Sequence, residues 1–344
     1  MRATEKQKLR GYSLLVAVMA AILVVCVLIS FALGRFPISP RELLTALGEK
    51  LFKLEKSADI TEQLRAILFN VRLPRVLLAC MVGCCLSVAG AAYQGVFQNP
   101  MAAPDILGAS SGAAAGAALA ILLELSAKMV MLFAFGASLL TISLVMLISN
   151  SARGNRVLRI ILAGIMVSSL CNAATSFIKL VADPNDVLPE ITFWLMGSLS
   201  KTKPENVLFA AFPMAIGLIP LLLLRWRINL LTLSDSEARS MGVNVSFVRV
   251  TVIVCATLVT AASVSVSGLI GWVGLVVPHL MRRLVGNNYR HLLPASMLGG
   301  AIFLLIVDNV SRNLLKTEIP IGILTSVIGA PFFIWLITRK KETV

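Results

Sequence analysis

Three arginines lie at the ends of long apolar segments, where a guanidinium would be accessible to a partner. Arg72 and Arg75 immediately precede one apolar run, and Arg312 follows the end of another. A guanidinium is a rigid fork of donors that binds a carboxylate through two hydrogen bonds, so these residues suit capture of an acidic surface. The alternative is that they only reach toward the polar boundary of a membrane. Asp308, four residues before Arg312, is spaced to pair with it on a helix.

A second candidate is a polar turn that interrupts the apolar sequence. Residues 76–104 contain no Asp, Glu, Lys or Arg, but Asn99 and Pro100 break the run and Met101 follows them. Proline disrupts a helix, and backbone freed at membrane depth needs internal partners or a water-lined cavity. The sequence therefore predicts two tightly packed spans joined by an irregular turn. That turn is either a functional element or a plain helix end capped by asparagine.

A third candidate is a short polar segment within a basic loop of the C-terminal half. Ser234 can cap a short helix, and Glu237, three residues later, completes a capping box. Ala238 and Arg239 continue that helix, and Gly242 is suited to end it. A short amphipathic helix of this kind either lies on the lipid surface or contacts another protein.

Enzymatic and metal-binding patterns are missing from the sequence. Neither a Walker A motif nor HExxH occurs, so no catalytic residue is predicted and the chain has no recognisable means of hydrolysing ATP. The six cysteines lie in apolar runs without metal-ligand spacing, which favours small buried residues over disulfides. His279 follows Pro278 and suggests a haem ligand, but a single histidine at a helix end is more often structural. We expect no resident metal or cofactor.

The composition indicates the class of protein that positions these residues. The chain has 344 residues, of which 58% are hydrophobic and 14% charged, whereas soluble domains have about 25% charged residues. This predicts an integral membrane protein with one domain, residues 1–344. The net charge is +14, but the basic residues cluster between apolar runs, which favours contact with membrane lipid and not with nucleic acid.

Ten stretches free of Asp, Glu, Lys and Arg predict an all-α protein with about ten transmembrane helices, since a span needs roughly 20 apolar residues. The stretch 269–281 is the weakest, because it is short and contains Pro278, and it is either a full or a partial span. Residues 191–200 are too short to cross and predict an interfacial helix. The ten stretches are 11–34, 76–97, 106–123, 129–148, 160–178, 207–224, 250–267, 269–281, 292–307 and 319–338.

The basic residues also predict the orientation. With the N-terminus inside, the segments expected on the inner side contain 17 of the 31 Lys and Arg residues. The outer segments contain 6 once the long loop 35–75 is set aside. Because cytoplasmic loops are enriched in Lys and Arg, and long loops are exempt from that bias, both termini are predicted to be cytoplasmic. The first run is longer than the core of a signal peptide and is interpreted as a retained helix.

Several motifs occur in an order that resembles one family of transport proteins, the permeases of ATP-binding-cassette importers for iron chelates, haem and vitamin B12. The resemblance covers nearly the whole chain and is more specific than any single glycine pattern. It is carried by RLPR at 72–75, QGVFQNPMA at 94–102, PDILG at 104–108, GLIGWVGLVVPH at 268–279, DNVSR at 308–312 and EIPIG at 318–322.

The resemblance implies the fold of a type II importer permease, in the cytoplasmic membrane of a bacterium, and a role for each candidate. Arg72, Arg75 and Arg312 would receive acidic residues of an extracytoplasmic substrate-binding protein. The turn at Asn99, Pro100 and Met101 would form the cytoplasmic gate, with Met101 where the family more often has leucine. The residues that would couple the chain to an ATPase are Ser234, Glu237, Ala238, Arg239 and Gly242.

The resemblance also implies the partners: a second permease chain, two ATPase subunits that bind the ATP, and the substrate-binding protein. Whether the second chain is identical is left open, with a homodimer as the first expectation. The first expectation for the cargo is a ferric siderophore, with haem and cobalamin as alternatives. An ion-gradient-driven secondary transporter is the rival function, but it requires ionisable groups near the membrane midplane, and nearly all the predicted spans lack them.

Overall fold

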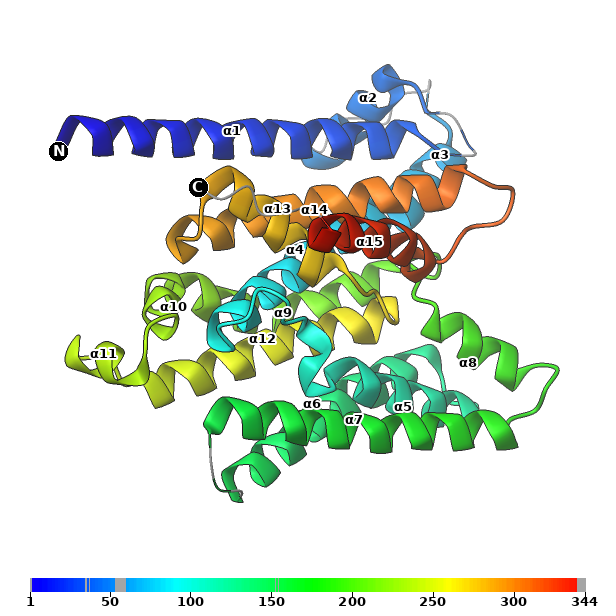
Figure 1. The fold of residues 1–344 in the computed structure, drawn as a ribbon. Coiled ribbons are helices and arrows are strands. Elements are labelled where there is room, and N and C mark those ends of the chain that lie inside the picture. Colours follow the sequence, from blue (N-terminus) through cyan, green and yellow to red (C-terminus); the bar gives the residue numbers. More distant parts are fainter. Residues whose placement is uncertain are drawn as a thin grey trace.

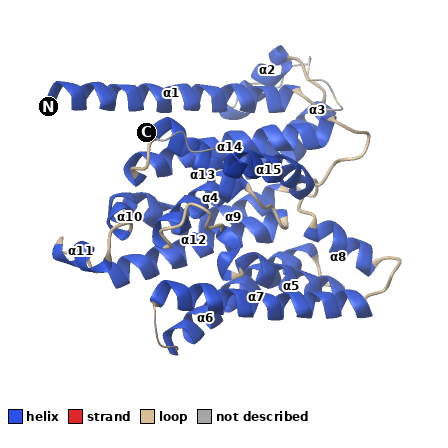
Figure 2. Ribbon diagram, in the orientation of Figure 1, coloured by secondary structure: helices blue, strands red, loops and turns tan. Residues whose placement is uncertain are grey.

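The computed structural model describes residues 2–34, 36, 38–52, 60–151, 153 and 155–338, and within these ranges it contains helices and no strand (Figure 2). Each of the ten apolar stretches coincides with a helix, which confirms an all-helical membrane fold. These helices are α1 (Arg2–Ala32), α4 (Leu73–Val96), α5 (Ala109–Leu122), α6 (Ala127–Ser151), α7 (Arg156–Val181), α9 (Pro204–Leu223), α12 (Val245–Ser267), α13 (Val273–Val285), α14 (Tyr289–Asn313) and α15 (Ile321–Thr338).

The helices differ in whether they are long enough to cross a bilayer. Among the described residues, 7 helical segments are long and apolar enough to do so, while α5 and α15 are shorter apolar helices. Helix α13 has 13 residues and therefore extends about 20 Å. The hydrocarbon core of a bilayer is roughly 30 Å thick, so α13 is too short to cross it as a helix alone. The same holds for α5, which has 14 residues.

Short helices lie at the two ends of the bundle. Figure 1 shows α2, α3 and α8 at one end, which we call the α8 end, and α10 and α11 at the other, the α11 end, where α1 also begins. The predicted interfacial helix exists as α8, but it starts at Val187 and ends at Leu195, so the expected start at 191 was wrong. The bounds are α2 (Pro40–Phe52), α3 (Glu62–Ala66), α8 (Val187–Leu195), α10 (Arg225–Leu231) and α11 (Asp235–Ser240).

Helix α4 is the centre of the bundle because its glycines allow two neighbours to approach closely. In an apolar 18-residue window of the helical segment that contains α4, 78% of the residues are buried, compared with 17% in α1. A Cβ atom at Gly83 would lie 2.2 Å from the carbonyl oxygen of Gly300 in α14. A Cβ at Gly90 would lie 1.8 Å from the carbonyl oxygen of Gly274 in α13. Small residues bring helix backbones together in this way when lipid gives no hydrophobic drive for association.

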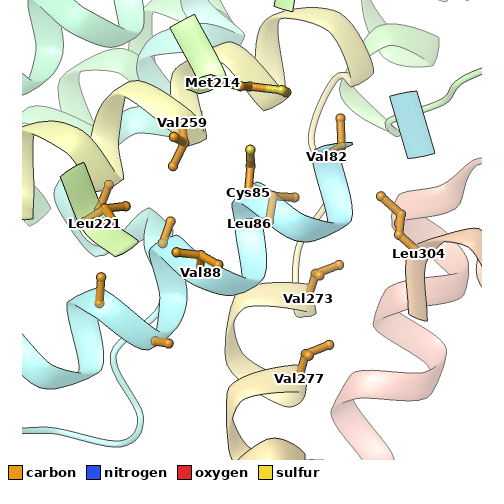
Figure 3. Close-up of a cluster of buried hydrophobic side chains, with 14 of the residues drawn as sticks. Val82, Cys85, Leu86, Val88, Met214, Leu221, Val259, Val273, Val277 and Leu304 are labelled. Carbon is orange, nitrogen blue, oxygen red and sulfur yellow. The ribbon is translucent and has the colours of Figure 1, made fainter. Parts of the chain in front are cut away.

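Large apolar side chains fill the space around these glycine contacts. Figure 3 shows them converging on α4 from α9, α12, α13 and α14. All are buried, and together they fix the position of α4 relative to four other helices. The labelled residues are Val82, Cys85, Leu86 and Val88 of α4, Met214 and Leu221 of α9, Val259 of α12, Val273 and Val277 of α13, and Leu304 of α14.

A second close contact joins α5 to α6. A Cβ at Gly112 would lie 2.2 Å from the Thr141 hydroxyl oxygen, and one at Gly116 would lie 2.3 Å from the carbonyl oxygen of Phe133. The prediction that the two spans joined by the turn pack tightly on each other was wrong, because α4 packs mainly on α14 and α5 on α6. The chain enters α5 through Gly108, whose φ of 78° is accessible mainly to glycine.

The glycine contacts predict opposite effects for two alanine substitutions. Gly83→Ala should destabilise the protein by about 1–3 kcal/mol, because overpacking forces the helices apart. Gly136→Ala in α6, where nothing lies within 4 Å of the new Cβ, should be neutral or stabilising by up to about 1 kcal/mol, since alanine favours helix over glycine. The measurement is the thermal unfolding midpoint in detergent. Equal midpoints for the two variants would contradict the proposed packing.

Candidate functional site

A buried ion network lies at the α8 end of the bundle. The Arg75 guanidinium lies 2.9 Å from Asp308 of α14 and 2.9 Å from Glu318, in the segment between α14 and α15. Arg312 lies 3.1 Å from Asp308, so the predicted intrahelical pair is confirmed. The Asp308 side chain is 0% exposed. Buried charges of this kind persist only when they are paired, and the network therefore ties α4, α14 and the start of α15 together.

Arg72 also lies at the α8 end, but its side chain contacts the end of α1 and not the ion network. Its guanidinium donates hydrogen bonds to the carbonyl oxygens of Phe31 and Phe36, near the end of α1. It is separated from Arg75 by Pro74, and it ends the π-helical turn η1 (Ile67–Arg72) that joins α3 to α4. Pro74 has no backbone N–H to donate, and the wider π-turn changes the hydrogen-bond pattern where that donor is missing. The two arginines of one motif thus hold different helices.

The three arginines predicted to dock a partner protein share one end of the bundle but are not displayed to solvent. Arg72 and Arg75 are each 5% exposed and Arg312 is 8% exposed. All three guanidiniums have partners within the chain. Their role in docking stays a prediction. A carboxylate of a partner would have to compete with Asp308 or Glu318 at Arg75 and Arg312, and with two backbone carbonyls at Arg72.

The predicted gate turn lies at the α11 end, between α4 and the short helix η2 (Pro104–Leu107). The Asn99 amide oxygen accepts a hydrogen bond from the backbone N–H of Met101 at 2.8 Å, which is the geometry of an Asx turn. The Asn99 N–H donates to the carbonyl of Gln94 at 3.2 Å. Asn99, Pro100 and Met101 are all exposed. The freed backbone is therefore satisfied locally, and the turn faces open space within this single chain.

The predicted coupling segment forms helix α11 with the expected cap. The backbone N–H of Ser234 donates to the Glu237 carboxylate at 3.0 Å, and the N–H of Glu237 donates to the Ser234 hydroxyl at 3.3 Å. Gly242 follows the helix with φ 79°. These contacts confirm the predicted capping box and helix end. The hydrogen bonds from the Ser234 side chain and backbone lower the pKa of Glu237, so the box is intact at neutral pH and weakens as the pH falls through that lowered pKa.

Helix α11 is fixed to the bundle by two contacts on its inward side. Asp235 accepts a hydrogen bond from Arg249 of α12 at 2.8 Å. Ala238 is 1% exposed, whereas Glu237 and Arg239 lie on the exposed side. The helix is thus held from within and presents its polar side chains outward.

A polar cluster near the gate turn was missed by reasoning from the sequence. Arg282 of α13 donates to the Gln94 amide oxygen at 2.6 Å and to the Tyr289 hydroxyl at 2.9 Å. Asn229 of α10 accepts from the backbone N–H of Tyr289 at 2.8 Å. The cluster joins α4, α13, α14 and α10. Gln94 lies 188 positions from Arg282, and Asn229 lies 60 positions from Tyr289, so no spacing rule relates them.

In the described part of the chain, the residues that are typical of metal binding or hydrolysis are not assembled into sites. Among the described residues, no group of three or more His, Cys, Asp or Glu side chains is placed to hold a metal ion. His279 packs against the Phe332 ring, with 6.1 Å between ring centroids. Residues 108–112 spell Gly-x-Ser-x-Gly, but they follow η2 and not a strand. A nucleophile elbow requires a strand-to-helix turn, so this match has the wrong context.

Comparison with known proteins places the chain in a family. Residues 22–339 match the FecCD transport family, so the chain belongs to that family. It is therefore the permease subunit of an ATP-binding-cassette importer of type II, and it is not the subunit that hydrolyses ATP. It is a multi-pass membrane protein.

Individual relatives agree with this assignment over most of their length. The molybdate import system permease protein MolB of Haemophilus influenzae is 40% identical, over 93% of this chain and 94% of MolB. The "probable iron chelatin transport system permease protein" of Helicobacter pylori is 44% identical, over 81% of this chain and 84% of its own. A chain from a metal-chelate-type ABC transporter, solved in an inward-facing conformation, superimposes with a TM-score of 0.85 at 38% identity, covering 94% of this chain and 99% of that one.

The ion network predicts a large effect for loss of its central carboxylate. Asp308→Asn leaves Arg312 without its ionic partner and should cost about 3–5 kcal/mol of stability, since an unpaired charge remains buried. Lys128→Ala removes a pair with Glu205 whose side chains are 72% and 63% exposed, and it should cost at most about 1 kcal/mol. The measurement is the thermal unfolding midpoint in detergent. An Asp308 variant as stable as the Lys128 variant would contradict this assignment.

Proposed function

We propose that this permease is one of two chains that enclose a translocation path for a metal chelate, and that separate ATPase subunits open and close the path. The observation that carries the proposal is the construction of α11. It is a short helix with a complete capping box, held to α12 through Asp235 and Arg249, with its charged face exposed. Such a helix suits transmission of force from a partner, because it can be displaced as a unit.

The surface around α11 supports contact with a protein partner. Leu233, Met241 and Phe247 are 38%, 57% and 61% exposed, and they lie beside the exposed Glu237 and Arg239 in the sequence. Large apolar side chains with polar neighbours are typical of protein interfaces. A lipid-surface helix is the alternative, and the capture experiment below distinguishes the two.

The proposed orientation places the α11 end in the cytoplasm. It rests on the enrichment of Lys and Arg in the segments at that end. Both termini are then cytoplasmic, although residues 339–344 lie outside the described residues. The α8 end faces the extracytoplasmic side, where the substrate-binding protein would dock.

Docking is proposed to use Arg75 and Arg312 through the buried ion network they belong to, and Arg72 beside it, where it binds carbonyl oxygens near the end of α1. Glu318 is its most accessible acidic member, with its side chain 33% exposed. Because Glu318 accepts a hydrogen bond from one Arg75 nitrogen and lies 2.9 Å from a second, an acidic residue of the binding protein would compete for the same fork. Docking would then act directly on α4 and α14, which contain Arg75 and Asp308.

A second permease chain is proposed to cover α7. In an apolar 18-residue window of this helix, only 22% of the residues are buried within the single chain. Ser169 and Asn172 are exposed near its middle, and polar groups at that depth face another helix or water in preference to lipid. The companion is an identical copy in the simplest arrangement, and a closely related permease is the other arrangement.

The cargo is proposed to be a ferric siderophore, with haem, cobalamin or molybdate as alternatives. Relatives named for molybdate and for an iron chelate resemble this chain to a similar degree. A path between two chains makes few specific contacts with a large chelate, and selection is then left to the binding protein. Direct binding of these compounds to that partner protein identifies the cargo.

In the proposed mechanism the chain performs no covalent chemistry. Closure of the ATPases moves α11, the helices follow, and the turn at Asn99–Met101 opens or shuts, which is alternating access by rigid-body displacement. A secondary transporter would instead lose uptake when the ion gradient is collapsed. Uptake into proteoliposomes that requires ATP and survives ionophores supports the importer, and the reverse result contradicts it.

The exposed charges of α11 predict loss of ATPase capture. The double variant Glu237→Ala, Arg239→Ala should recover little or none of the ATPase that co-purifies with the tagged permease, because the outward face of the coupling helix is removed. The matched control is Glu190→Ala, Lys201→Ala, an exposed charge pair 3.5 Å apart at the α8 end. Undiminished capture by the α11 variant would show that the ATPase binds elsewhere.

A further inference from the structure

Gln98 connects the gate turn to the segment that precedes α11. Its amide nitrogen donates to the carbonyl oxygen of Leu231 at 2.8 Å and to that of Leu233 at 2.9 Å. These two carbonyls lie on either side of Thr232, and Leu233 directly precedes the Ser234 cap of α11. Of the two ends of a side-chain amide, only the –NH₂ end donates hydrogen bonds, so its two carbonyl partners fix the orientation of the Gln98 amide.

The backbone at Gln98 belongs to the cap that ends α4. Its φ is 50°, in the left-handed region that is common at the residue after a helix C-cap. Its N–H donates to the carbonyl of Gly95 at 3.4 Å, and the N–H of Asn99 donates to that of Gln94 at 3.2 Å. These two hydrogen bonds form a Schellman motif, which fixes where the Gln98 side chain leaves the helix.

Gln98 lies where the end of α4 contacts α10, and it supplies hydrogen bonds to that contact. A Cβ at Gly95 would lie 2.6 Å from a methyl group of Ile228, so α4 and α10 touch at that point. Gln94 is held on the opposite side by Arg282 of α13. The end of α4 is therefore clamped between α13 and α10, and the side chain of Gln98 spans the remaining distance to α11.

We infer that Gln98 is a positioning residue that transmits displacement of α11 to the gate turn. The inference rests on the proposed function, since it assumes that an ATPase moves α11. Leu231 is the last residue of α10 and Leu233 lies just beyond it, so their carbonyls lack partners within that helix. The Gln98 amide binds both. When the segment 231–233 moves, the turn that begins at Gln98 must follow or release these hydrogen bonds.

The first test measures the link in the purified permease, without partners. Gln98→Glu keeps the size of the side chain but replaces both N–H donors with an acceptor. Gln98→Gly adopts φ 50° without strain and removes the amide. Both should raise hydrogen–deuterium exchange of the backbone amides in residues 232–242 by about tenfold, as expected when two hydrogen bonds are lost. Gln63→Glu, an exposed glutamine in α3, is the matched control and should leave exchange unchanged.

Unchanged exchange in both Gln98 variants would overturn the inference, because the amide would then not hold α11. A change in Gln98→Glu alone would also overturn it, since the effect would come from the new charge. Faster exchange in both variants, with the control unaffected, supports the link.

The second test uses the assembled importer with its ATPase and binding protein in proteoliposomes. The Gln98 variants should capture the ATPase as the wild type does, while cargo transported per ATP hydrolysed falls several-fold. An unchanged transport-to-ATP ratio would overturn the transmitting role. A wild-type chain that captures no ATPase would overturn the proposed function itself, and that failure is visible before any Gln98 variant is measured.

Discussion

Every backbone polar group of a chain in lipid must find a partner within the protein, and the bundle follows from that constraint. The helices satisfy it by themselves, and α4 occupies the centre because Gly83 and Gly90 let α14 and α13 approach its backbone. The stretch between α4 and α5 is irregular, so its groups need partners elsewhere. It is found at the α11 end, where Asn99 supplies a hydrogen bond locally and Gln98 reaches α10.

The gate turn and the ion network at the α8 end are held by different kinds of interaction. At the α8 end, Arg75, Asp308 and Arg312 form ion pairs that are almost completely buried. Removing one partner from such a set is costly, and the arrangement is therefore stiff. The α11 end also contains charged contacts, but the connections that Gln98 makes there are neutral hydrogen bonds near solvent, whose net contribution is about 1 kcal/mol each. The connection made by Gln98 is thus easier to rearrange than the ion network.

Much of this organisation could be predicted from the sequence because it is encoded locally. Runs without charged residues located ten helices, and Ser234, Glu237 and Gly242 located the cap and end of α11. The exposure of the arginines could not be predicted. Arg75 pairs with residues more than 230 positions away, and no rule of spacing reveals whether a guanidinium at a helix end faces a partner protein or a buried carboxylate.

The same limit explains why Gln98 escaped notice although it lies inside the most recognisable motif. Its partners are backbone carbonyls 133 and 135 positions later, and a carbonyl leaves no trace in residue identity. A neutral amide also suits this position better than an ion pair would. Hydrogen bonds to carbonyls can be broken and remade at small cost near solvent, whereas a desolvated ion pair favours one state strongly. A connection that must exist in more than one conformation of a transport cycle is therefore better made with an amide.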